Sequence, residues 1–76
     1  MAAKELAPKI RVNGICPGLI LPPKGKDIHY LEAKSQTIPL QHYGDVSDIV
    51  QSIRFVVNNR FITGDCLFLD GGEHLT

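Results

Sequence analysis

Two short apolar runs on either side of one amphipathic helix constrain this chain more than any other feature. Residues 10–16 and residues 66–69 are dominated by large or β-branched apolar side chains, without the strict alternation of a half-exposed strand. Such runs are typical of strands in a parallel sheet that is covered on both faces. Between them, residues 45–58 place apolar side chains at offsets 0, 3, 4, 7, 10 and 11, which is one stripe of an α-helix.

The predicted helix has clear end signals as well as a stripe. Asp45 is expected to be its N-cap, and Asp48 adds a favourable negative charge to the first turn. Asn58 and Asn59 are expected at its C-terminal end. We expect the stripe to be core, or core plus subunit interface. Its members are Val46, Ile49, Val50, Ile53, Val56 and Val57.

The order strand, helix, strand predicts an α/β fold in which a βαβ unit carries two parallel strands. The chain has 76 residues and offers only these two strands and one full helix. A parallel sheet needs cover on both faces and several paired strands. We therefore expect the unit to be incomplete as a stand-alone domain and to belong to a larger sheet.

The rest of the chain divides around this unit. The expected divisions are the end of a helix at 1–8, a strand at 10–16, a corner and lid at 17–40, a helix at 45–58 and a strand at 65–70. A connection as long as the lid is usually functional. Within it Asp27 is a candidate N-cap for a short helix that turns Ile28, Leu31 and Tyr30 inward.

Charge and composition exclude several function classes. Eight basic and eight acidic residues are spread singly, which argues against a nucleic-acid partner, and no apolar run approaches the length of a membrane span. The three histidines have no metal-ligand spacing, and no metal is expected. Cys16 and Cys66 are expected to be inert buried thiols. Two isolated thiols and the absence of an export signal predict a cytoplasmic location.

Three motifs in order carry a family resemblance that covers nearly the whole chain: "ELAPKIRVNGICPG", "IPLQHYGDVSDIVQSIRFVV" and "FITGDCLFLDGG". Together they resemble the C-terminal segment of a short-chain dehydrogenase/reductase (SDR). The resemblance implies the C-terminal βαβ part of a Rossmann-like, doubly wound parallel sheet. "RVNGICPGLILPP" and "DGGEHL" are most similar to pteridine reductases of the dihydromonapterin and dihydrofolate reductase type, which reduce a dihydropterin with NADPH.

The resemblance implies where a cofactor would bind. The corner formed by Pro17 and Gly18 follows a strand, and ligands of open α/β sheets bind beyond the carboxyl ends of strands. The backbone after this corner holds the nicotinamide carboxamide in relatives, which assigns Pro17, Gly18 and Ile20 to NADP(H) in the full-length enzyme. Glycine there would let a ring approach the backbone closely, although a plain turn is the alternative. Relatives often have Thr at Pro22, which cannot make the same bond.

A substrate wall and a catalytic pair are the other candidates. Leu19, Leu21 and Tyr30 could line an apolar wall for a pterin-like molecule, or simply pack the lid. Tyr30 and Lys34 have Tyr-x-x-x-Lys spacing, but they follow the corner, where the family has its lid, so no catalytic residue is assigned. The family's Gly-rich turn, Ser and Tyr-x-x-x-Lys motif do not lie in this sequence, and the isolated chain is expected to bind no cofactor and to be inactive.

Some assignments stay open between two alternatives. Asn13 is either satisfied by neighbouring backbone or contacts a ligand directly, and His74 is either a surface residue or an acid or base. The function itself has a rival: a non-catalytic interaction or oligomerisation module that pairs with itself or with a full-length relative. In the first hypothesis the partners are the remainder of the SDR domain and further copies in a homotetramer.

Overall fold

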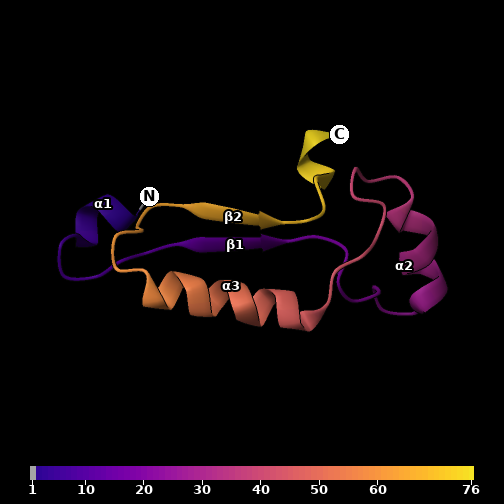
Figure 1. The fold of residues 1–76 in the computed structure, drawn as a ribbon, viewed down its shortest axis with the longest axis horizontal. Helices are drawn as coiled ribbons and strands as arrows, with labels where there is room; N and C mark the ends of the chain where they lie inside the picture. Colours follow the sequence, from indigo (N-terminus) through magenta and orange to yellow (C-terminus); the bar gives the residue numbers. More distant parts are fainter. Residues whose placement is uncertain (1) are drawn as a thin grey trace.

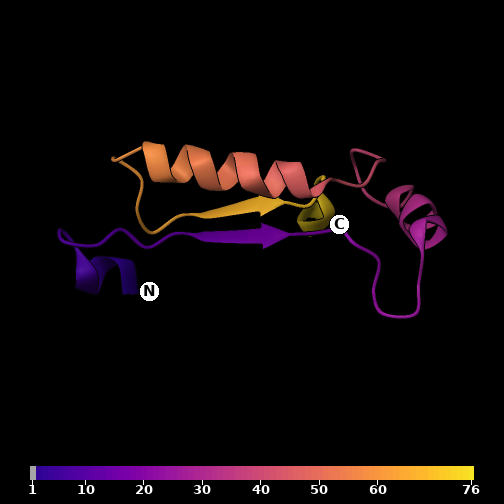
Figure 2. The same cartoon turned by 90° about the horizontal axis from the view of Figure 1, so that it is seen from below.

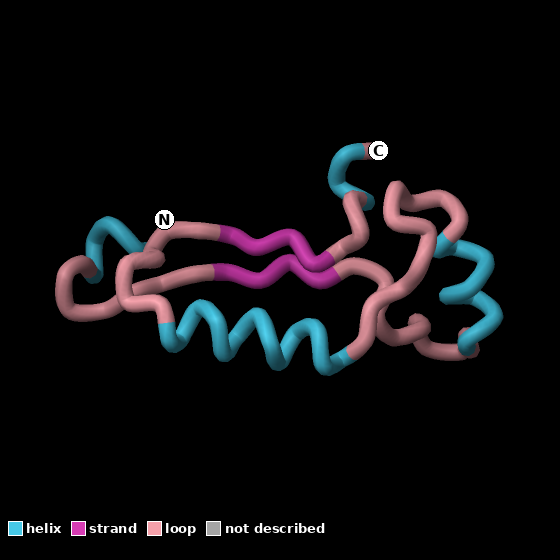
Figure 3. Tube along the Cα trace, in the orientation of Figure 1, coloured by secondary structure: helices cyan, strands magenta, loops and turns pink. Residues whose placement is uncertain are grey.

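The structure, a computed structural model, describes residues 2–76. Figures 1 and 3 show an elongated chain, 45 × 23 × 21 Å, with its first helix at one end and its second at the other. The elements in chain order are α1 (Ala2–Leu6), β1 (Gly14–Pro17), α2 (Ile28–Ser35), α3 (Val46–Asn58), β2 (Cys66–Leu69) and the 3-10 helix η1 (Glu73–Leu75). None of the helices within residues 2–76 is long and apolar enough to cross a membrane.

β1 and β2 form a parallel pair in which Gly14 lies opposite Cys66 and Pro17 opposite Leu69. α3 connects the two ends of this pair and runs along one side of it (Figure 2). The predicted α/β class and the order strand, helix, strand are therefore confirmed.

Both strands are shorter than predicted, and the difference has a local cause. A strand was expected over residues 10–16, but β1 begins at Gly14, and β2 covers Cys66–Leu69 rather than 65–70. Before Gly14 the chain bonds to the facing turn through side chains: Val12 donates its N–H to Thr63 Oγ1 at 3.1 Å, and Asn13 Oδ1 accepts the Asp65 N–H at 3.1 Å. The Val12 carbonyl still accepts the Gly64 N–H at 2.8 Å, but side chains make the other bonds, so the regular ladder starts only at Gly14.

Arg11 and Asn13 together make a polar clasp at the amino end of the strands. Arg11 Nη1 and Nη2 donate to the carbonyls of Val56 and Val57 at 3.0 and 3.1 Å, and Nη1 also reaches the Ile62 carbonyl at 3.1 Å. A cation at the last carbonyls of α3 is favoured by the helix dipole. Asn13 Nδ2 donates to the same Ile62 carbonyl at 3.1 Å, which confirms the backbone-satisfied alternative for this side chain.

The ends of α3 are those that the sequence predicts. Asp45 accepts the Ser47 N–H at 3.2 Å while its own N–H donates to Asp48 Oδ2 at 2.8 Å, which is a capping box. The Ser47 hydroxyl, followed by the Ser47 N–H, lowers the pKa of the Asp45 carboxyl. At the other end the Asn59 N–H donates to the Phe55 carbonyl at 3.0 Å and closes the helix.

The stripe of α3 is less buried than predicted. Ile49 and Val56 are half-buried, and no residue of α3 is fully buried. Four members of the stripe are exposed, so the prediction of a stripe that is core throughout is wrong, which leaves the alternative of core plus subunit interface: Val46, Val50, Ile53 and Val57. Two strands of four residues are too narrow to cover the full width of this helix.

Most of the best-buried side chains lie in the lid instead. Leu31 and Ser35 of α2 are buried, and so are Ile20 and Ile38 in the flanking loops. Asp27 is the N-cap of α2, as predicted, and accepts the His29 N–H at 3.0 Å. The predicted inward orientation is correct for Leu31, whereas Ile28 is exposed and Tyr30 is half-buried.

The face of β2 turned away from α3 is open within the described chain. Successive strand residues point to opposite faces, and here Leu67 and Leu69 are half-buried while Cys66 and Phe68 are exposed. The prediction that Cys66 is buried was therefore wrong, because no helix of residues 2–76 runs along that face (Figure 2). The strands were expected to need cover on both faces and to find it on only one within this chain, and residues 2–76 do cover only one face.

Candidate functional site

The corner of Pro17 and Gly18 lies where the two strands end together. Pro17 is the last residue of β1 and is exposed, and the Gly18 N–H donates to the Leu69 carbonyl at 2.9 Å, one step beyond the ladder. The chain then turns away from β2 toward the lid (Figure 1). The corner is thus at the carboxyl edge of a parallel sheet, the edge at which α/β proteins bind ligands.

Contact with Asp70 explains why residue 18 is a glycine. A Cβ at this position would lie 2.6 Å from Asp70 Cβ and 2.8 Å from Asp70 Cα, and 3.1 Å from Glu73 Oε1. We expected the glycine to leave room for a ligand ring. The structure gives that room to Asp70, so the corner is a packing contact between the ends of β1 and β2 whatever else binds there.

Beyond the corner, the chain is pinned to the start of α3. The Leu19 carbonyl accepts the Gly44 N–H at 2.8 Å, and the buried Ile20 side chain lies 3.4 Å from where a Gly44 Cβ would stand. Within the described residues, the Ile20 N–H and carbonyl have no hydrogen-bond partner in the protein. The backbone of Ile20 therefore has one unpaired donor and one unpaired acceptor next to the corner.

A groove of about 500 Å³ opens beside these residues, between α3, β2 and the 38–44 loop. Its polar members come from α3 and from the loops, and its apolar members make most of the wall: Leu19, Ile20, Ile38, Leu40, Phe55, Leu67, Phe68 and Leu69. Of the predicted site residues the groove brings together Leu19 and Ile20. Leu21 is exposed and Tyr30 sits on α2, and neither lines the groove.

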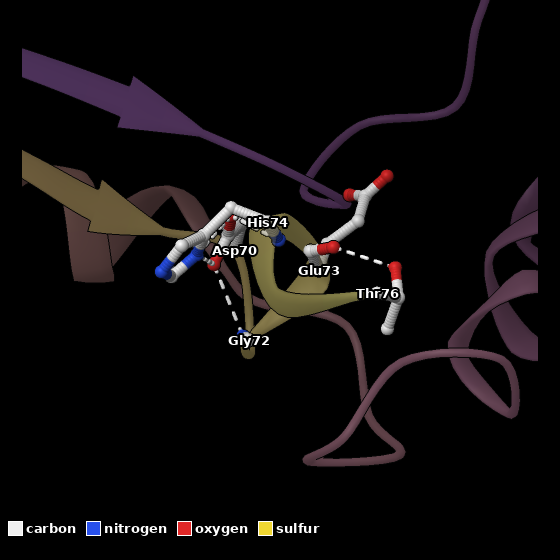
Figure 4. A network of polar contacts seen from close by, with 5 residues as sticks. All are labelled: Asp70, Gly72, Glu73, His74 and Thr76. Carbon is white, nitrogen blue, oxygen red and sulfur yellow. Dashed lines mark hydrogen bonds and ion pairs between the residues drawn. The ribbon is translucent and has the colours of Figure 1, made fainter.

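Residues 70–76 form a compact turn beside the corner, which we call the 70–76 turn (Figure 4). Asp70 accepts the N–H groups of Gly72 and His74 at 3.0 and 3.1 Å, and His74 Nδ1 lies 2.9 Å from Asp70 Oδ2. The imidazole stacks on Phe68 with 4.2 Å between ring centroids. Burial raises the pKa of Asp70, but the hydrogen bonds from His74 and Gly72 outweigh it and hold that pKa below its usual value.

His74 is therefore more than a plain surface residue, although its side chain is 39% exposed. Its pairing with Asp70 was not predicted from the sequence. The spacing of four residues was a usable signal, since it is one helical turn, but the glycines between them do not indicate a helix.

The two thiols lie near each other across the strands. Gly14 faces Cys66, and a Cβ on Gly14 would be 3.5 Å from Cys66 Sγ, so the absent side chain leaves space there. Contact with the Cys16 thiol, followed by desolvation, raises the pKa of the Cys66 thiol. A raised pKa lowers the thiolate fraction, which makes Cys66 a weak nucleophile despite its exposure.

Comparison with known proteins gives consistent matches over almost the whole chain. The family described as enoyl-(acyl carrier protein) reductase matches residues 1–74. The chain is 41% identical over 75 residues to 3-oxoacyl-[acyl-carrier-protein] reductase from Bos taurus, a match that covers 97% of this chain and 31% of that protein. The chain thus spans about a third of the length of the curated relatives it matches.

Two solved structures extend the match to three dimensions. FolM Alternative dihydrofolate reductase 1 from Brucella suis, in complex with NADP, superposes with a TM-score of 0.90 at 39% identity, covering 97% of this chain and 30% of that one. A small-chain dehydrogenase in complex with NADPH gives a TM-score of 0.77 at 38% identity, covering 99% of this chain and 36% of that one.

Proposed function

The chain belongs to the short-chain dehydrogenase/reductase family, and from this premise we propose that it is the C-terminal segment (residues 1–76) of a reductase domain that uses NADP(H). The observation that supports the proposal is the position of the corner at the carboxyl edge of the sheet. The chain that contains it superposes with a TM-score of 0.90 on a protein crystallised with NADP. The remainder of the domain would supply the phosphate-binding turn and the acid–base residues, which no part of this sequence supplies.

The backbone of Ile20 is the best-suited part of this chain for the nicotinamide. A carboxamide has one acceptor oxygen and one donor NH₂, and the backbone of Ile20 has an unpaired N–H and an unpaired carbonyl. Burial of the Ile20 side chain fixes this pair in place. Pro17 and Gly18 hold the turn that aims it, and Pro22 adds no hydrogen-bond donor. NADPH, when bound, supplies the hydride, and this chain's part is to orient the ring.

We further propose that the substrate is a dihydropterin or dihydrofolate. The similarity to the FolM protein supports this choice, whereas the bovine relative is named for a 3-oxoacyl substrate at similar identity. Leu21 is 71% exposed and Tyr30 is half-buried, so both have apolar surface free for a flat heterocycle. Leu19 would contribute from the groove side. Tyr30 has no catalytic role in this proposal.

The experiment is a chimera in which residues 1–76 replace the matching segment of the Brucella suis FolM protein. We expect NADPH-dependent reduction of dihydropterin or dihydrofolate by the chimera and none by the 76-residue chain. Reduction of a 3-oxoacyl substrate in place of the pterin would contradict the substrate assignment. Failure of a folded chimera to bind NADPH would contradict the cofactor assignment.

Assembly into a homotetramer, at a cytoplasmic location, completes the proposal. The four exposed stripe residues of α3 are spaced symmetrically about the midpoint of Gln51 and Ser52, so Val46 mirrors Val57 and Val50 mirrors Ile53. Two copies of α3 packed antiparallel about a twofold axis would match apolar positions to each other and oppose the helix dipoles. A stripe of this symmetry also supports the rival function, a non-catalytic module that pairs with a relative.

The variant Val50→Glu tests whether the stripe of α3 is an interface. It should dissociate the assembly in sedimentation of the chimera, because it places a charge at the centre of the symmetric stripe. Val50→Thr keeps the shape without the charge and serves as the matched control. An unchanged sedimentation coefficient for Val50→Glu would remove α3 from the interface.

A further inference from the structure

The 70–76 turn contacts the corner at Gly18 on one side and the 38–40 segment on the other. His74 bonds to this turn from a position that does not line the groove. Asp70 has a side chain only 10% exposed, and two of its bonds come from His74, through the N–H and through Nδ1. The imidazole is itself held from its face by Phe68. His74 thereby fixes the direction of the Asp70 carboxylate without lining the groove.

Asp70 passes this constraint to the corner. Its Cα and Cβ occupy the space where a Gly18 side chain would stand, so the backbone of the corner rests directly on Asp70. The Gly18 N–H also donates to the carbonyl of Leu69 at 2.9 Å, so the corner is bonded to the residue that precedes Asp70. A shift of Asp70 must therefore displace Gly18, since no flexible side chain lies between them to absorb it.

The same turn supports the return from the lid. Gly71 has φ +62°, and a Cβ there would lie 2.9 Å from Ile38 Cδ1. Gly72 has φ +89° and packs equally tightly on the ring of Pro39. The Leu40 N–H donates to the Gly71 carbonyl at 3.0 Å. Positive φ at both positions is available to glycine at low cost, which lets the turn fit against the 38–40 segment.

We propose that His74 is a positioning residue: by holding the Asp70 carboxylate it keeps the corner and the 38–40 segment at a fixed spacing on either side of the 70–76 turn. Its consequence for a ligand rests on the proposed cofactor site. His74 acts through Asp70 on the place where the nicotinamide would bind, so it governs cofactor affinity and leaves the hydride step to the residues that touch the reacting atoms.

The test uses the chimera and two substitutions at one position. His74→Phe keeps a ring to stack on Phe68 but removes the Nδ1 donor, whereas His74→Gln keeps a donor for Asp70. We expect His74→Phe to speed amide hydrogen exchange at Gly18 and Leu40 about tenfold and to raise the Kd for NADPH by a similar factor, the size expected for one charge-assisted hydrogen bond. kcat should stay within about twofold. His74→Gln should restore most of both effects.

The molecule provides its own controls. His29 also pairs with an aspartate, Asp27, at 3.4 Å, but on the lid helix and in the open, so His29→Phe should change neither readout. The amides of Gly14 and Gly64 bond at the amino end of the strands and should exchange at unchanged rates in His74→Phe.

Unchanged exchange at Gly18 and Leu40 in His74→Phe would overturn the proposal. So would equal acceleration at all four amides, because that indicates a general loss of stability. Faster exchange at Gly18 and Leu40 in a chimera that never binds NADPH would support the positioning role and contradict the cofactor site, which keeps the two claims separable.

Discussion

The burial of α2 and α3 is the reverse of what their apolar periodicities predict. α3 has the stronger apolar stripe, thirteen residues long, yet no residue in it is fully buried. α2 has eight residues and weak periodicity, yet Leu31 and Ser35 are almost completely buried. α3, whose sequence predicts a core helix, is half exposed. α2, whose sequence predicts a short helix within a loop, has the more deeply buried side chains.

The difference lies in where each helix finds its neighbours. α2 lies in the lid, where Ile20 and Ile38 are also buried, so the residues buried with it belong to the same segment of the chain. α3 needs a surface as wide as its stripe, and β1 and β2 provide four residues each. Apolar periodicity therefore reports that a helix has a face to bury, but not whether the same chain provides the cover.

Unfolding of the isolated 76-residue chain is the strongest test of whether α3 lacks cover. Each large apolar side chain left exposed forgoes about 1.5–3 kcal/mol of burial, which is comparable to the stability a chain of this size can have. We expect the dilute monomer to show no cooperative transition by circular dichroism, or to be folded only as an oligomer in sedimentation. A sharp transition in a proven monomer would mean that α3 needs no further cover.

Leu31→Ala in the chimera should give the largest effect of a single substitution. Leu31 is 2% exposed, and removal of a buried leucine side chain costs about 2–5 kcal/mol in free energy of unfolding. Chemical denaturation measures it. A loss below about 1 kcal/mol in free energy of unfolding would mean that the buried residues of the lid do not form a packed cluster.

Arg11→Leu tests how α3 is attached to the strands. It removes three hydrogen bonds to carbonyls at the end of α3 and in the turn before β2, and we expect a loss of roughly 1.5–3 kcal/mol in free energy of unfolding. Arg11→Lys should recover only part of it, because a single ammonium nitrogen lacks the planar fork whose two terminal nitrogens reach carbonyls at separate places. Equal stability of wild type and Arg11→Leu would make the clasp irrelevant to α3.

Ile53→Ala should have a small effect where α3 is uncovered. Ile53 is 47% exposed, and in the dissociated Val50→Glu background we expect a loss below about 1 kcal/mol. The same substitution should cost more in the assembled chimera, where a second copy would cover it. Equal costs in the two backgrounds would place the interface elsewhere.

The smallest effect concerns pH. The folded-state pKa of Asp45 is lowered, so the cap contributes stability that is fully present above the usual pKa of 3.8 and is lost as pH falls through the folded value. Asp45→Asn keeps a capping oxygen that does not titrate, and its acid unfolding curve by circular dichroism should lack this component. Identical acid curves for the two proteins would show that the cap does not couple to pH.

The sequence predicts local features well and distant contacts poorly. The caps of both helices and the backbone-satisfied Asn13 follow from side-chain chemistry within a few residues, and they are confirmed. The contact of Gly18 with Asp70 joins parts of the chain far apart in sequence, and no local pattern announces it. For the same reason the glycine was explained by a ligand, when a neighbouring strand end already fills its space.

The Arg11 clasp has a consequence for synthesis of the chain. Its guanidinium bonds to the carbonyls of Val56, Val57 and Ile62, which follow Arg11 by 45 to 51 residues. At about 5–20 residues per second a ribosome takes several seconds to make that interval. During this time the apolar residues 10–16 have left the ribosome without the strand they pair with, so they are exposed to chaperones and to other nascent chains until β2 emerges.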